Sequence, residues 1–97
     1  MVDGIVQNDG DDFVSNTGSN VTIYGGKGND SINNFASDVT ISGGEDSDTI
    51  NNTDTADNVS ITGDAGNDVI NNWGASVEVS GGEGNDTVNN SGSTVSI

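Results

Sequence analysis

The chain has 97 residues and a formal net charge of −15, because 16 acidic residues are opposed by the single basic residue Lys27. Only 29% of the residues are hydrophobic, and the sequence contains no Leu, Arg, His, Cys or Pro. This balance excludes nucleic acid and anionic membranes as partners, since both need a basic surface, and no apolar run is long enough for membrane insertion. With so little apolar area, a folded state needs stabilisation beyond a conventional core.

The chain consists of one unit repeated five times, which is the sequence signature of a repeat architecture. We expect residues 1–6 to form an edge strand or cap, followed by a single domain over residues 7–97. An aspartate that closes a glycine-rich run recurs at spacings of 18, 18, 20 and 18 residues. The third repeat alone carries two extra residues, between Thr53 and Asn58. The predicted repeats cover residues 7–24, 25–42, 43–62, 63–80 and 81–97.

Each repeat contains two short apolar patterns separated by polar turns. An aliphatic residue follows the aspartate by two positions and precedes a polar pair, which is Asn-Asn in four copies. Further on, β-branched residues alternate with Ser, Thr or Glu, as in "VTIS" from Val39, and this pattern indicates a strand with one buried face. We therefore predict an all-β fold, a parallel β-roll or β-solenoid of about five 18-residue coils with two short strands per coil. Stacked asparagines such as Asn34 and Asn52 are expected to form amide hydrogen-bond ladders.

The glycine-rich run "GGKGND", from Gly25 to Asp30, has three possible interpretations. A phosphate-binding loop is excluded, because Lys27 precedes Gly28 rather than Ser or Thr and no helix is expected after it. A metal-free tight turn explains the glycines, which tolerate left-handed backbone conformations, but not an aspartate in all five copies. Carboxylates stacked about 5 Å apart need a cation between them, and Ca²⁺ suits carbonyl and carboxylate oxygens.

The run resembles the nonapeptide G-G-x-G-x-D-x-U-x of the RTX (repeats-in-toxin, haemolysin-type) calcium-binding proteins. It recurs as "GGKGNDSIN", "GGEDSDTIN", "GDAGNDVIN" and "GGEGNDTVN". The resemblance implies a parallel β-roll in which Ca²⁺ lies between stacked turns, bound by backbone carbonyls and by aspartates of two successive turns. Five turns leave four gaps, so about four ions are expected.

The resemblance also implies a set of ligands on this chain. The carboxylate ligands would be Asp12, Asp30, Asp48, Asp68 and Asp86. The carbonyl ligands would come from Gly25, Gly26, Lys27, Gly28, Gly43, Gly44, Glu45, Gly63, Ala65, Gly66, Gly81, Gly82, Glu83 and Gly84.

Several departures from the family pattern predict a one-sided roll. Family rolls often bind calcium along both edges, whereas here the other half-coil has Val39, and valine in the other copies, where the aspartate is expected. We therefore expect calcium on one edge and an asparagine-rich, metal-free edge opposite. Asp46 and Asp64 replace motif glycines, so the sites that they border are expected to be distorted or more acidic. Gln7 and Asn8 stand in place of Gly-Gly, which makes the first site the weakest match.

Aromatic residues are few and stand at particular places in the repeat. Phe35 and Trp73 occupy equivalent positions at the start of the metal-free turn, where they either shield the edge of the stack or mark a surface for a ligand. Phe13 and Tyr24 are expected to cover the end of the roll. Catalysis lacks its usual side chains, since there is no His, Cys or Arg, and we predict that the chain is not an enzyme.

We predict a calcium-binding module of a secreted or cell-surface protein that folds when Ca²⁺ binds, because a ligand that binds only the folded state supplies the missing stability. The resemblance implies export by a type I secretion system, a toxin or adhesin as parent, and stacking with further repeats of that parent. The alternative is a metal-independent adhesive or spacer solenoid that presents its asparagine and aromatic edge to a glycan or a protein.

Overall fold

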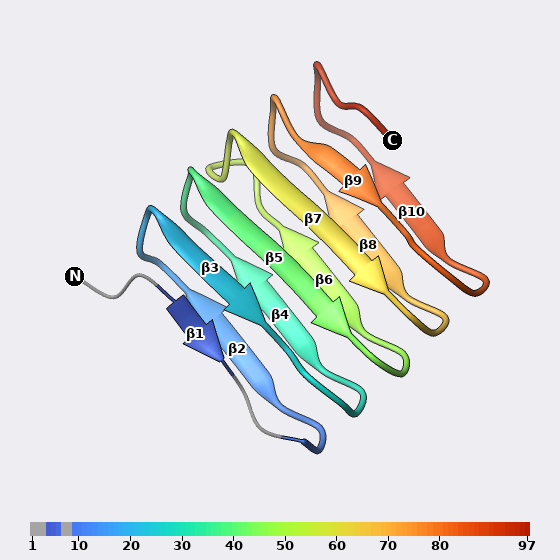
Figure 1. The fold of residues 1–97 in the computed structure, drawn as a ribbon. Helices are drawn as coiled ribbons and strands as arrows, with labels where there is room; N and C mark the ends of the chain where they lie inside the picture. Colours follow the sequence, from blue (N-terminus) through green and yellow to red (C-terminus); the bar gives the residue numbers. More distant parts are fainter. Residues whose placement is uncertain (1–3, 7–8) are drawn as a thin grey trace.

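The computed structural model describes residues 4–6 and 9–97, which form two parallel five-stranded sheets (Figure 1). The first sheet has the order β1-β3-β5-β7-β9 and the second the order β10-β8-β6-β4-β2, so the predicted all-β parallel solenoid is confirmed. Gln7 and Asn8 lie outside the described residues. No helix that could span a membrane occurs in the part of the chain that the structure describes. The strands are β1 (Gly4–Val6), β2 (Phe13–Asn16), β3 (Val21–Tyr24), β4 (Ser31–Asn34), β5 (Val39–Gly44), β6 (Thr49–Asn52), β7 (Val59–Asp64), β8 (Val69–Asn72), β9 (Glu78–Ser80) and β10 (Thr87–Asn90).

Each coil passes once through each sheet, and equivalent residues of successive coils lie side by side. Ile32 of β4 pairs with Ile50 of β6, which in turn pairs with Ile70 of β8. Four complete turns separate β2 from β10, which is close to the five coils expected. The two extra residues of the third repeat leave this register unchanged, because they are contained in the turn between β6 and β7, where Ala56 is fully buried.

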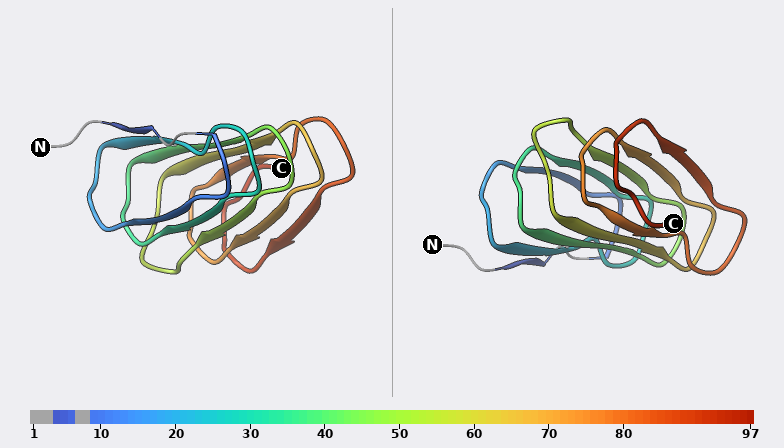
Figure 2. Two further views of the ribbon diagram at one scale, coloured as in Figure 1. Left: turned by 90° about the horizontal axis from the view of Figure 1, so that it is seen from below. Right: turned by 90° about the horizontal axis from the view of Figure 1, so that it is seen from above.

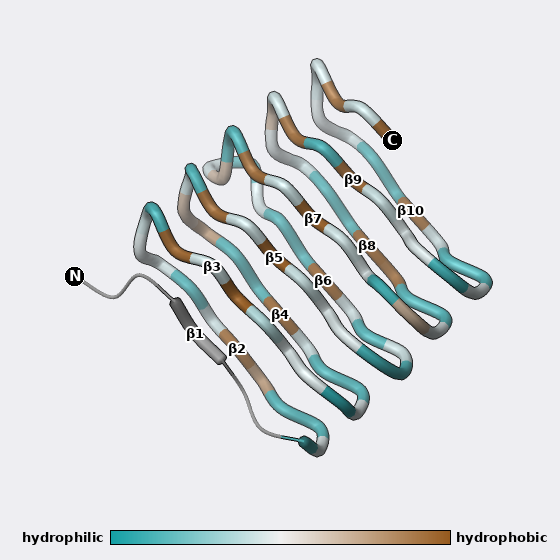
Figure 3. The backbone as a smooth tube through the Cα atoms, in the orientation of Figure 1, coloured by the Kyte–Doolittle hydropathy of each residue, from teal (hydrophilic) through white to brown (hydrophobic). Residues whose placement is uncertain are grey.

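The core is a thin layer of mostly β-branched side chains between the two sheets. Figure 2 shows these sheets as the two layers of the ribbon. Inward and outward residues alternate along the strands, so that Val39 and Ile41 of β5 are buried while Thr40 is exposed. Apolar residues therefore recur at the same level of every coil, and polar residues collect at the turns (Figure 3). The molecule extends 33 × 30 × 14 Å, and so thin a slab has only one apolar layer to stabilise it.

Two asparagine ladders run along the stack, and the inner one contains the asparagines for which a ladder was predicted. The inner ladder is buried except at Asn90, and each of its side-chain amides also donates to a backbone carbonyl in the turn that follows its strand; Asn34, for example, donates to Asn52 and to the carbonyl of Ala36. The outer ladder runs in the opposite direction, so that Asn51 donates to Asn33. The inner ladder satisfies buried polar groups that would otherwise destabilise the core. It consists of Asn16, Asn34, Asn52, Asn72 and Asn90.

Candidate metal centre

The glycine-rich turns stack along one edge of the roll, at the lower right of Figure 1. Each complete turn has two residues with positive φ, at the second and fourth positions of the motif, for example Gly26 (91°) and Gly28 (103°). Asp46 (75°) and Asp64 (70°) take the same backbone conformation at these positions, which aspartate tolerates better than most residues. The two substitutions therefore add carboxylates without changing the sign of φ in the turn.

The motif aspartates form a buried column directly behind these turns. Asp30, Asp48 and Asp68 are each only 1% exposed. In each of them, Oδ1 accepts a hydrogen bond from the backbone N–H of the equivalent aspartate in the preceding coil, at 2.8 to 2.9 Å. The second oxygen has no partner: Oδ2 of Asp12, Asp30, Asp48 and Asp68 is buried without a hydrogen bond. Such an oxygen is costly to bury as an anion unless a cation compensates it.

The unpartnered oxygens point toward the first glycine of their own turn. A methyl group built on Gly25 would lie 2.6 Å from Oδ2 of Asp30 and 2.5 Å from the carbonyl oxygen of Gly43 in the next coil. A methyl group on Gly43 would meet Oδ2 of Asp48 at 2.6 Å and the carbonyl oxygen of Gly63 at 3.0 Å. A carboxylate oxygen and a carbonyl oxygen of the following coil therefore approach the same place, which explains why no side chain is tolerated there.

The column also changes the acidity of its members. Burial raises the pKa of Asp48 to about 7, and the neighbouring carboxylates of Asp68 and Asp30 add to this rise. Burial also raises the pKa of Asp68 to about 6, and it raises that of Asp30. Folding thus places these carboxylates where burial disfavours their negative charge. A cation bound beside them would offset this penalty.

The predicted carbonyl ligands lie in the same turns, and several of them also hold the stack together. The carbonyl oxygens of Gly26 and Gly44 accept N–H bonds from Glu45 and Ala65 of the following coils, at 3.1 and 3.2 Å. A carbonyl oxygen has two lone pairs, so each can accept this bond and still face a cation. Among the described residues, no three acidic side chains come together as a metal-binding group, so an ion on this edge must take most of its ligands from the backbone.

The remaining predicted ligands lie at the ends of the column or on its surface. Asp12 and Asp86 are partly exposed, because each has a described neighbouring aspartate on one side only. The side chains of Lys27, Glu45 and Glu83 are exposed, so these residues face the column only through their backbone.

One feature of the turns was not predicted. In three copies the residue before the motif aspartate accepts a backbone N–H bond from the equivalent residue of the following coil: Asp11 accepts from Asn29, Asn29 from Ser47, and Asn67 from Asn85. Asp46 similarly accepts from the N–H of Gly28. The recurrence of Asn before Asp in "GND" is the sequence pattern from which these hydrogen bonds could have been predicted.

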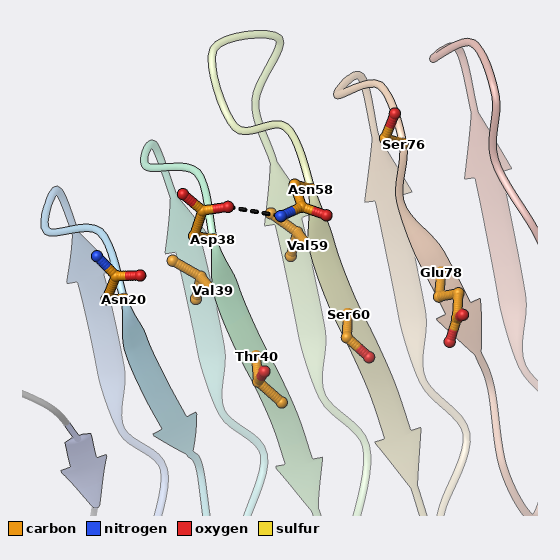
Figure 4. A pocket seen from close by; sticks show the side chains of 9 residues that line it. All are labelled: Asn20, Asp38, Val39, Thr40, Asn58, Val59, Ser60, Ser76 and Glu78. Atoms are coloured by element: carbon orange, nitrogen blue, oxygen red, sulfur yellow. Dashed lines mark hydrogen bonds between the residues drawn. The ribbon is translucent and has the colours of Figure 1, made fainter.

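The opposite edge is built differently. Four of the five valines that replace the aspartate of the second half-motif are buried in the core, including Val39 (2% exposed) and Val59 (3%), and Val95 is partly buried against it. Its turns use positive φ at Asn20, Asp38 and Asn58, where Asn58 donates to the carboxylate of Asp38. These side chains form one wall of an open groove of about 500 Å³ over the first sheet (Figure 4). The described residues that line this groove include no column of stacked aspartates, so the groove differs from the edge with the glycine-rich turns.

A parallel β-roll with repeated glycine-aspartate turns on one edge defines a class of repeat module that binds metal between its coils. The model of the RTX calcium-binding nonapeptide repeat matches this chain in four copies, over residues 7–34, 36–57, 53–74 and 78–92. The chain therefore belongs to the RTX calcium-binding repeat family, and the resemblance seen in the sequence is confirmed. Comparisons with curated proteins and with solved structures gave no match.

Proposed function

We propose that this chain is a calcium-driven folding module, in which Ca²⁺ binds between the glycine-rich turns of one edge and thereby holds the roll together. The observation that carries the proposal is the repetition of a buried, unpartnered carboxylate oxygen at four successive levels, on Asp12, Asp30, Asp48 and Asp68. A single unpartnered carboxylate oxygen has many explanations. Four of them, stacked at successive levels in a chain of a calcium-binding repeat family, are all explained by a cation in each gap between neighbouring aspartates.

The residues that would hold the ions follow from this column. Successive aspartates, from Asp12 to Asp86, would each contribute the free oxygen, and carbonyl oxygens of the glycine-rich turns would complete the sites. Bound Ca²⁺ supplies positive charge and accepts many oxygen ligands in flexible geometry, which suits backbone carbonyls better than the strict octahedron of Mg²⁺ does. Four gaps between five aspartates correspond to about four ions.

Folding coupled to calcium binding follows from the charge of the chain. A net charge of −15 on 97 residues opposes compaction, and the thin apolar core contributes little against it. Calcium that binds the roll and not the unfolded chain shifts the equilibrium toward the folded state by mass action. We therefore propose that the module stays unfolded at cytosolic calcium levels, is exported by a type I secretion system, and folds outside the cell as part of a secreted or surface protein.

The opposite edge takes no part in this proposal. Valine stands at the position of the second motif aspartate in all five copies, and its apolar side chain offers no oxygen to a hard cation. The module would therefore bind calcium on one edge only, and it has no catalytic role.

The decisive experiment is circular dichroism of the chain at a pH above the raised pKa of Asp48, at increasing calcium and then in excess chelator, together with calorimetry to count the ions. We expect strand signal to appear with calcium, to vanish with chelator, and to respond far less to magnesium, with about four ions bound. A spectrum that keeps its strand signal in chelator would contradict calcium-driven folding and support a metal-independent solenoid.

A further inference from the structure

The outer face of the second sheet is uncharged although the chain as a whole is strongly acidic. Strand alternation buries the second and fourth residues of β4, β6 and β8, so the first and third residues point outward. The sheet hydrogen bonding continues for one residue beyond these strands, through N–H bonds from Phe35, Thr53 and Trp73 to the preceding coil. We define the second-sheet face as the first and third residues of the five even-numbered strands together with the residue that follows each of these strands, such as Phe35 and Trp73. None of these positions holds an acidic or a basic residue.

Two exposed aromatic rings are aligned across this face. Phe35 is 44% exposed and Trp73 is 48% exposed, and they occupy equivalent positions just after β4 and β8. Since β6 lies between these strands, the rings are separated by two strand spacings, or about 9.5 Å. Thr53 occupies the position between them, so the two rings flank a small polar side chain.

The middle of the face carries a row of amides with unused hydrogen-bonding capacity. A side-chain amide has two N–H donors and two acceptor lone pairs. In the outer ladder, Asn51 donates one N–H to Asn33 and accepts one from Asn71, and Asn71 in turn accepts one from Asn89. Each interior amide therefore keeps one donor and one acceptor that the ladder does not use. A ligand hydroxyl group offers the complementary pair.

We propose that the second-sheet face binds a neutral, linear polysaccharide that lies across the strands along the axis of the roll. Its sugar rings would stack on Phe35 and Trp73, whose separation is close to the length of two sugar units in an extended chain, and its hydroxyl groups would bond the asparagine row. This is a binding activity beyond calcium-driven folding, which only keeps the face assembled.

The charge distribution selects this ligand over others. The net charge of −15 falls to about −7 when about four Ca²⁺ add eight positive charges, so the folded chain still repels an anionic polymer, and a cationic one is attracted to the acidic edges instead of this face. The groove over the first sheet is a poorer candidate for a neutral glycan, because carboxylates of Asp38 and Glu78 line it and no aromatic ring does.

The test is affinity gel electrophoresis of the calcium-loaded chain in gels that contain hydroxyethyl cellulose, a neutral β-1,4-linked glucan, with carboxymethyl cellulose, which has the same backbone, as the anionic comparison. We expect hydroxyethyl cellulose to retard the chain and carboxymethyl cellulose not to. Phe35→Ala and Trp73→Ala should each weaken the retardation constant roughly tenfold. Tyr24→Ala is the matched control, since Tyr24 is 50% exposed but lies in the first sheet.

The outcomes separate this proposal from calcium-driven folding, because circular dichroism with calcium reports folding for every variant. A folded wild-type chain that is not retarded by hydroxyethyl cellulose overturns the glycan proposal and leaves the calcium proposal intact. Equal losses in Tyr24→Ala and Trp73→Ala, or a loss in Glu78→Gln with none in Trp73→Ala, would place binding elsewhere and also overturn it. Sedimentation that shows a dimer dissociated by Trp73→Ala would identify a second copy as the occupant instead.

Discussion

Replacing Asp48 by Asn should have opposite effects in the absence and presence of calcium. Asparagine keeps the Oδ1 atom that accepts the N–H of Asp30, but it puts an uncharged NH₂ group in place of the unpartnered Oδ2. Without calcium, the change removes a buried negative charge from the column and should stabilise the roll. With calcium, it removes one ligand from the two gaps on either side of Asp48.

The size of the first effect can be worked from the pKa of Asp48. One pKa unit corresponds to about 1.4 kcal/mol, so a rise from 3.8 to about 7 corresponds to roughly 4 kcal/mol against the charged folded form. Solvent screening at the edge of a thin slab lowers this value, and we expect a gain of about 1 to 2 kcal/mol in the calcium-free stability at neutral pH. Calcium affinity at the two neighbouring gaps should fall by at least about tenfold.

The assay is circular dichroism with calorimetry for calcium affinity: in chelator the chain is folded by increasing concentrations of the osmolyte trimethylamine N-oxide, which strengthens burial, and in saturating calcium it is unfolded by urea. Asp57→Asn is the matched control, because Asp57 is also an aspartate whose Oδ1 accepts a backbone N–H, from Ala75 of the next coil, but it is exposed on the edge opposite the glycine-rich turns. A variant of Asp48 that loses stability in chelator, or one that binds calcium as the wild type does, would refute the reasoning.

Three further predictions concern the pH, the inner ladder and the turns. Because the folded pKa values of Asp48 and Asp68 are raised from 3.8 to about 7 and about 6, their contribution to calcium-free stability is fully present below the ordinary value and is lost progressively as pH rises to the folded values. Circular dichroism in chelator over this whole interval should show strand signal at the acidic end only. Asn52→Ala breaks the buried amide ladder and should cost roughly 2 to 4 kcal/mol in urea unfolding with calcium, and a cost under about 0.5 kcal/mol would contradict the role of the ladder. Gly25→Ala should weaken calcium binding, because its methyl group meets two oxygens, whereas Gly18→Ala makes only ordinary contacts and should leave binding unchanged in the same calorimetric titration.

Most of the fold could be predicted from the sequence because the repeat is local. An 18-residue period, alternating β-branched residues and glycine-rich turns leave stacking of coils as the only way to bury Ile32, Ile50 and their equivalents. The inner asparagine ladder followed from the same argument, since identical residues at identical places in stacked coils must lie side by side.

The sequence by itself thus determined the winding, the column of aspartates and the family, since each depends only on which residues recur at which spacing. Only the tertiary structure decided which oxygen of each aspartate is used by the backbone and which is left free, because that depends on the exact stagger between coils. It also showed that Asp46 and Asp64 keep the glycine conformation, and that Phe35 and Trp73 share a face without charge. These features depend on how neighbouring coils are placed relative to one another, which the order of residues along the chain does not specify.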